Sequence, residues 1–374
     1  MTGTPILDLE QAPPELKSSR RNRLIGLAIG AMIGGLLALF TRDDAPNLNF
    51  LYWIPALYVA VAVHELGHLL AGSLVGMKPG GLVIGGLAIM KSGDHYSIRF
   101  DFKRIIGGGM AMPLTQKDKF IPRQFAWMVA GGPIASLSLT VLCGTLSVVR
   151  SDYSGGWINV LFWMALLTMT SLIPASAGLN KSDGARLREL LRHPDRVGPW
   201  IALVAIQSEE KQGILPRDWD SELVDRALAT PPDANEYPFC QLLMFYRQAD
   251  LGNETAATEH LENVLATAVR GRKLFCHACY LEAAAASAMM RKNSANAKTW
   301  LERACKLQKP LMRDSVDGAI AICEERYEEA LNHLQKAREF IKRRKLDSGL
   351  ARFAKENLEK YEALCKSALS TPAL

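Results

Sequence analysis

The sequence predicts an all-α polytopic membrane protein, with about four transmembrane helices and a small β-hairpin insertion, followed by an α-helical repeat domain. Four observations lead to this prediction. Apolar runs of near-spanning length lie in the first half of the chain. One loop between them alternates apolar and polar residues, and the second half shows helical periodicity with a soluble composition. The 49% hydrophobic content and mean hydropathy of +0.03 match a chain that is half membrane and half soluble.

The charge balance argues against nucleic acid as a partner. The 374 residues contain 44 Lys and Arg against 38 Asp and Glu, and no basic run is interleaved with aromatic residues. The seven cysteines are odd in number, and six of them lie in the second half. We therefore expect them to be reduced, buried side chains of a cytoplasmic domain.

Residues 24–198 are predicted to form the membrane domain, preceded by a disordered cytoplasmic arm over residues 1–23. The predicted spans are about 24–40, 51–77, 124–149 and 157–177. No small-residue cleavage site follows the first of them, so we expect it to be retained. The loop over residues 78–123 carries eight Lys and Arg against three acids, which places it and both termini in the cytoplasm. The absence of targeting segments suggests a bacterial cell membrane.

Within that loop, residues 96–102 alternate apolar and polar side chains, and residues 82–90 form an apolar run broken by glycine. A Lys-Ser-Gly-Asp turn separates the two segments. This pattern predicts a β-hairpin from Leu82 to Phe102.

The strongest functional signal is the motif His64-Glu65-Leu66-Gly67-His68 inside the second predicted span. Residues i and i+4 share one face of a helix, so both imidazoles can bind one Zn²⁺, with Glu65 beside it as the general base. An ionisable residue inside a membrane span costs about 2.5–3.5 kcal/mol on insertion scales, which favours a functional role. A third protein ligand is needed, and Asp183 is the candidate just beyond the fourth span.

These features resemble the site-2 protease family of intramembrane zinc metalloproteases over roughly residues 51–190. The motif, its span and the order of the later Asp-Gly pair all agree with that family. The resemblance implies that His64, His68 and Asp183 bind zinc and that Glu65 is the catalytic base. It also implies hydrolysis of peptide bonds in single-span membrane proteins. The predicted hairpin would then offer an exposed edge to an extended substrate segment.

Two positions differ from the usual pattern of the family. An asparagine commonly follows a Gly-Pro pair in the middle core span, and another precedes the Asp-Gly motif, where they are thought to hold the substrate backbone or the oxyanion. This chain has Ser136 and Ser171 at those places. We therefore expect these serines to position substrate, with hydroxyl groups in place of amides.

Residues 199–374 are predicted to form a cytoplasmic helical-repeat domain that resembles tetratricopeptide repeats in the second helix of each unit. Helical hairpins are expected over residues 240–268, 275–307 and 314–341, with a capping helix over 344–369. In each hairpin a small residue, a leucine and a small or branched residue recur at the same spacing: Ala257, Leu261, Val264; Ala297, Leu301, Ala304; Ala330, Leu334, Ala337. Such a domain usually binds a peptide or a partner protein.

The sequence thus favours an intramembrane zinc endopeptidase over three alternatives. The least favoured is a soluble-type zincin anchored to a membrane, because its third ligand would normally lie on an aqueous helix or loop. Two others are weighed against specific residues. The first is a catalytically inactive membrane scaffold that binds protein partners through the repeat domain, which the two serines favour and the intact zinc motif disfavours. The second is a metal-ion transporter, which would need more polar residues along a path through the membrane than the first and fourth spans contain.

Overall fold

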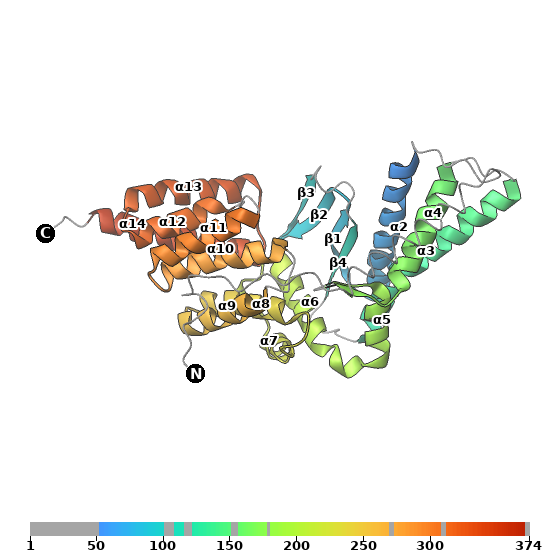
Figure 1. Cartoon of the computed structure of the whole chain (residues 1–374), viewed down its shortest axis with the longest axis horizontal. Helices are drawn as coiled ribbons and strands as arrows, with labels where there is room; N and C mark the ends of the chain where they lie inside the picture. The colour runs from blue at the N-terminus through green and yellow to red at the C-terminus, as the bar shows by residue number, and fades with distance from the viewer. Residues whose placement is uncertain are drawn as a thin grey trace. The chain divides into compact units, whose positions relative to one another are not determined.

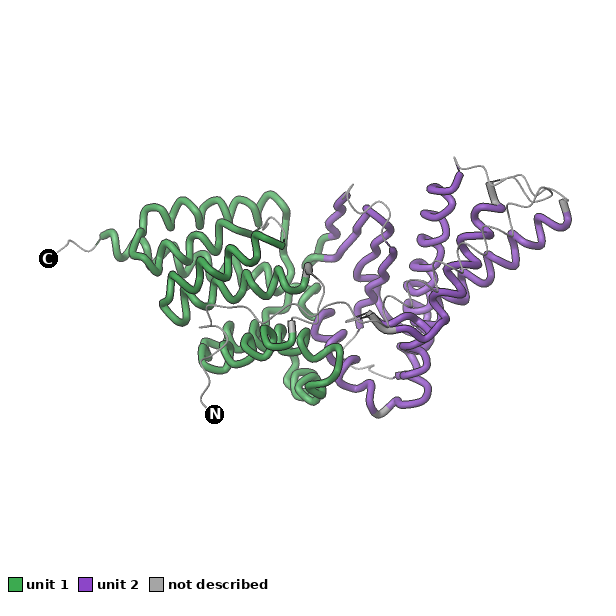
Figure 2. Tube along the Cα trace, viewed as in Figure 1, with its two compact units in different colours: residues 1–16, 92–95, 209–374 green, residues 17–91, 96–208 purple. Residues whose placement is uncertain are grey.

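A computed structural model of the protein describes residues 52–100, 108–115, 122–150, 156–177, 180–268, 273–307 and 312–370. Helices dominate these residues, and a small antiparallel sheet interrupts them (Figure 1). The described residues divide into two compact units (Figure 2). The first unit in chain order, labelled unit 2 and purple in Figure 2, contains residues 96–208 together with those up to Lys91. The second, labelled unit 1 and green, contains Ser92–His95 and the residues from Glu209 onward.

Three apolar helices form the framework of the first unit: α2 (Trp53–Leu74), α3 (Pro122–Arg150) and α4 (Gly156–Leu172). Among the described residues, α2 and α3 are long and apolar enough to cross a membrane, and α4 is a shorter apolar helix. The predicted spans at 51–77 and 124–149 thus correspond to α2 and α3. The predicted span at 157–177 is helical only as far as Leu172. The arm over 1–23 and the span over 24–40 lie outside the described residues.

Helices α2 and α3 cross where two glycines face each other. A Cβ atom on Gly67 would lie 2.5 Å from the Gly131 carbonyl oxygen, and one on Gly131 would collide with the Gly67 carbonyl oxygen. Small residues at such a crossing let two helix backbones approach closely. The crossing lies within the HExxH motif, so α3 packs directly behind the two histidines.

The residues that connect α2 to α3 in the sequence form a sheet of four strands in the order β3-β2-β1-β4. Their bounds are β1 Lys78–Ile84, β2 Leu87–Ser92, β3 His95–Phe100 and β4 Gly109–Leu114. Strand β1 pairs with both β2 and β4 in antiparallel fashion, for example Leu82 with Ile89 and with Ala111. The predicted turn lies between β2 and β3, but the predicted first strand over residues 82–90 contains the end of β1, a turn at Gly85 and Gly86, and part of β2. The prediction of a single hairpin was therefore too small. Strand β4 was missed because Gly-Met-Ala-Met-Pro-Leu lacks the alternating β-branched residues that mark a strand.

A segment of two short strands and three helices follows α4. It comprises the two-residue strands β5 (Ser176–Ala177) and β6 (Asn180–Lys181), helix α5 (Asp183–Arg192), the short helix η4 (Pro194–Arg196) and α6 (Gly198–Lys211). Buried Leu190 and Ile201 pack in one cluster with Phe125 from the start of α3. This cluster fixes α5, and with it Asp183, against the apolar helices.

The second unit is formed by consecutive helices. They are η5 (Pro216–Asp218), α7 (Ser221–Leu228), α8 (Tyr237–Asp250), α9 (Glu254–Ala268), α10 (Lys273–Met289), α11 (Ser294–Leu307), α12 (Arg313–Cys323), α13 (Tyr327–Arg343) and α14 (Gly349–Ser370). The pairs α8–α9, α10–α11 and α12–α13 match the three predicted helical hairpins. All nine recurring small and leucine positions are buried. Their assignment to tetratricopeptide repeats stays a prediction.

The helix crossing gives the first testable prediction. Gly131→Val should lower the melting temperature of the detergent-purified protein, because the new side chain must push α2 and α3 apart, at a cost of about 1–3 kcal/mol or more. Gly144→Val on the same helix is the matched control, since the nearest atom to a Cβ there is Leu161 Cδ1 at 3.9 Å. Equal melting temperatures for the two variants would contradict the packing described.

Candidate metal centre

Helix α2 brings three residues of the HExxH motif into the interior of the first unit. His64, Glu65 and His68 are all buried, although each is polar or ionisable. The opposite side of the same helix exposes Leu66, Leu70 and Leu74, as expected of a surface that faces lipid. The helix therefore separates an apolar outer face from a polar inner one, and the two imidazoles lie one turn apart on the inner face.

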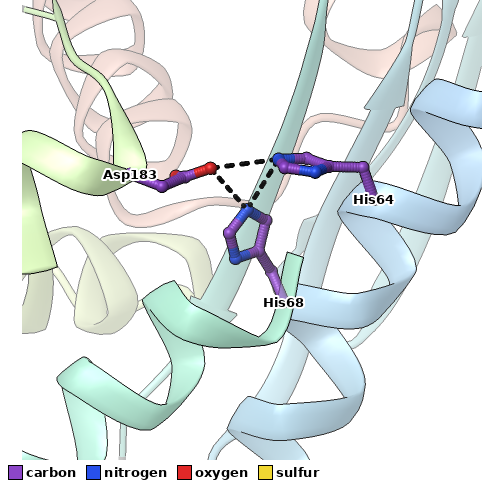
Figure 3. Close-up of side chains that lie close together, drawn as sticks. All are labelled: His64, His68 and Asp183. Carbon is purple, nitrogen blue, oxygen red and sulfur yellow. Dashed lines mark hydrogen bonds and ion pairs between the residues drawn. The ribbon is translucent and has the colours of Figure 1, made fainter. Parts of the chain in front are cut away.

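Asp183, the first residue of α5, meets both histidines (Figure 3). Its Oδ2 atom lies 3.0 Å from His64 Nε2 and 3.5 Å from His68 Nε2, and the two Nε2 atoms are 3.3 Å apart. Three potential ligand atoms from two distant parts of the chain thus converge at one point.

This spacing fits a bound zinc ion. With zinc–ligand bonds of about 2.0–2.2 Å, tetrahedral angles separate neighbouring ligand atoms by about 3.3–3.6 Å. Two of the three observed separations, 3.3 and 3.5 Å, lie within that range, and the third, 3.0 Å, lies slightly below it. Two imidazole nitrogens and one carboxylate oxygen are also a usual donor set for zinc, which leaves a fourth position for water or substrate.

The other nitrogen of each imidazole is engaged as well. His64 Nδ1 lies 2.8 Å from Ser136 Oγ, and His68 Nδ1 lies 2.9 Å from the Met128 carbonyl oxygen. A proton on each Nδ1 therefore has an acceptor, which leaves the Nε2 lone pairs free for a metal. Gly132 gives His68 its room, because a Cβ atom there would collide with the imidazole.

The Ser-Asp-Gly sequence places the carboxylate through local backbone contacts. Ser182 caps α5 by accepting from the Ala185 N–H, and its hydroxyl donates to the Ile173 carbonyl oxygen at 2.6 Å. Gly184 packs so tightly against the Leu172 carbonyl that a Cβ atom would collide with it. The residues on either side of Asp183 thus attach it to the end of α4.

The environment of Asp183 favours its ionised form. Burial by itself would raise the pKa of this carboxyl group, but hydrogen bonds and charge interactions with His64 and His68 lower the pKa to about 2. Its position in the first turn of α5 acts in the same direction, because the N-terminus of a helix stabilises negative charge. A carboxylate is the form that binds a metal.

The side chain of Glu65 extends from α2 toward the edge strand β4. Its carboxylate accepts a hydrogen bond from the Ala111 N–H and interacts electrostatically with His64, His68 and Asp183. A Cβ atom on Gly109 would collide with the Glu65 carboxylate, so the strand approaches at a residue without a side chain. This arrangement holds an acidic group beside the three ligand atoms without making it part of them.

The two serines predicted to position substrate have separate surroundings. Ser136 is fully buried and contacts His64 rather than an open surface. Ser171 is half-buried, and its hydroxyl donates to the Thr168 carbonyl of its own helix at 3.2 Å. No site role was predicted from the sequence for Ser182, Gly109 or Gly132. They can be recognised only from their proximity to the motif in the fold, because serine and glycine are too common in sequences to mark a site.

The chain is similar to a known family of peptidases. A family model described as peptidase family M50 matches residues 52–343. This places the chain in the class of membrane metallopeptidases that depend on zinc, at the level of the family. Because the match covers most of the sequence, the chain belongs to peptidase family M50, the site-2 protease family. Comparisons with curated proteins and with solved structures found no match.

The geometry predicts one metal ion per chain. Detergent-purified wild-type protein should contain about one zinc per chain by elemental analysis, and Asp183→Ala should lose most of it, because only two ligands then remain. The control is Asp233→Ala, an exposed aspartate of the second unit, which should keep the zinc. An unchanged zinc content in Asp183→Ala would remove this residue from the ligand set.

Proposed function

We propose that this protein is an intramembrane zinc metalloendopeptidase that cleaves single-span membrane proteins. The observation that supports the proposal most strongly is the convergence of His64, His68 and Asp183 beside buried Glu65 on an apolar helix. Membership in peptidase family M50 supports the peptidase class. We also propose cytoplasmic termini, a bacterial cell membrane as the location, and a peptide or protein partner for the C-terminal helical unit.

In the proposed reaction, His64, His68 and Asp183 would hold the zinc ion. When bound, zinc polarises the scissile carbonyl and lowers the pKa of water at the site. Glu65 takes the proton of the attacking water and passes it to the leaving amine. The Ala111 N–H keeps the Glu65 carboxylate oriented before substrate arrives, so little reorganisation accompanies the proton transfer.

The edge strand β4 is the proposed docking site for substrate, in place of the edge of the Leu82–Phe102 hairpin expected from the sequence, because β4 contacts Glu65. A helical substrate hides its carbonyl groups in its own hydrogen bonds, so it must unwind locally before hydrolysis. Strand β4 is one end of the sheet, and Ala111 of this strand contacts Glu65. An unwound segment paired with this edge would therefore have its backbone next to the proposed base.

The alternative of an inactive scaffold rested on the two serines in place of asparagine. Ser136 makes a contact that supports a metal ligand, and Glu65 retains both its burial and its place beside the cluster. These observations favour the peptidase. Absence of zinc from the wild-type protein would favour the scaffold instead.

Glu65→Gln tests the role of the base. Glutamine keeps the size of the side chain and one acceptor oxygen but cannot take a proton. Zinc content should therefore stay near the wild-type value, while cleavage of co-expressed, tagged single-span reporter proteins should fall by about 10²–10⁴-fold on immunoblots. Cleavage at the wild-type rate would exclude Glu65 as the base.

A second experiment addresses the docking strand. Met110→Pro should lower reporter cleavage by about tenfold or more while leaving zinc content unchanged, because Met110 pairs with Val83 of β1 and a proline there would displace β4 from the sheet. Ile98→Pro on β3, the opposite edge of the sheet, is the matched control and should have a much smaller effect. Equal losses of cleavage in both variants would count against β4 as the docking edge.

A further inference from the structure

We infer that Ser136 is a positioning residue for the metal ligand His64. Its hydroxyl accepts the Nδ1–H of the imidazole and so presents Nε2 to the metal. This inference rests on the proposed metal centre and deepens it. It gives Ser136 a role different from the substrate contact that its sequence position suggested.

The contact is short, buried and made between two helices. Ser136 Oγ on α3 lies 2.8 Å from His64 Nδ1 on α2, and the exposed fractions of the two residues are 0% and 4%. At such low exposure no bulk water replaces the serine as an acceptor. The close crossing of the helices at Gly67 and Gly131 makes this reach possible for a side chain as short as serine.

The direction of the hydrogen bond follows from the chemistry of the imidazole ring. A neutral ring carries one proton, on either Nδ1 or Nε2. Nε2 of His64 faces Asp183 and His68, so a metal bound there needs the Nε2 lone pair and leaves the proton on Nδ1. Ser136 Oγ is therefore the acceptor. The serine selects the tautomer and fixes the angle of the ring.

The two histidines differ in how they are held. His68 donates to a main-chain oxygen, the Met128 carbonyl, which no side-chain substitution removes. His64 depends on the side chain of Ser136. A single substitution at position 136 therefore isolates the effect of one outer contact, with the ligand set itself left unchanged.

The test measures zinc affinity directly, by competition of the purified full-length protein with a chromophoric chelator. Ser136→Ala should weaken zinc binding by about 10–100-fold, the range found when outer partners of metal ligands are removed. Ser136→Thr keeps the hydroxyl and should restore most of the affinity. Ser138→Ala is the matched control, because Ser138 is exposed two residues further along α3 and its hydroxyl donates only to the Ile134 carbonyl oxygen.

The cobalt-substituted protein gives a second measurement that does not depend on cleavage. The visible absorption of Co²⁺ reports ligand geometry, so its spectrum should change in Ser136→Ala and remain as in the wild type in Ser138→Ala. A melting curve of each metal-free variant separates metal positioning from packing. Ser136→Ala should melt close to the wild type without metal.

Three results would overturn the inference. In the first, Ser136→Ala binds zinc within twofold of the wild type and has an unaltered cobalt spectrum. In the second, Ser136→Ala and Ser136→Thr lose affinity equally and both melt early without metal, which would indicate a packing role. In the third, the wild-type protein binds no zinc, which would overturn the proposed metal centre as well. The first two results leave that centre intact, so the two failures are distinguishable.

Discussion

Two imidazoles and a carboxylate share one small volume between apolar helices, and the surrounding structure depends on this contact. Each group would be costly to bury alone, but together they can hold a cation whose charge offsets that of the carboxylate. The glycines nearby follow from the same constraint. Gly132 leaves space for His68 and Gly109 leaves space for Glu65, so the backbone approaches the site where side chains would block it.

The centre is built from elements of different kinds, and each contributes what its geometry allows. The helix α2 supplies two ligands at fixed spacing, α3 supplies the outer contacts to both imidazoles, and the first turn of α5 supplies the carboxylate. Strand β4 adds backbone rather than side chains. Rigid elements hold the ligands, while the strand edge presents the kind of surface to which another extended chain can pair.

The sequence predicted much of this site because helical spacing is a local property. His64 and His68 had to share a face, and Asp183 was the acidic residue in the expected place beyond an apolar helix. Strand β4 and the contact of Ser136 with His64 could not be predicted from the sequence. The strand is held by pairing with β1 rather than by the propensity of its residues, and the serine reaches His64 only across a helix crossing, 72 residues away along the chain. The helical hairpins of the second unit were predicted closely because their small and leucine positions repeat at regular spacing.

His64 and Asp183 are 119 residues apart in sequence. An ion shared by them closes that whole segment into a loop, much as a disulfide would, and restricts the unfolded chain more than a link between near neighbours would. Holding the ion therefore has a mechanical consequence besides a chemical one. A bound ion would join α2 to α5 and would so stabilise the folded protein relative to the unfolded chain.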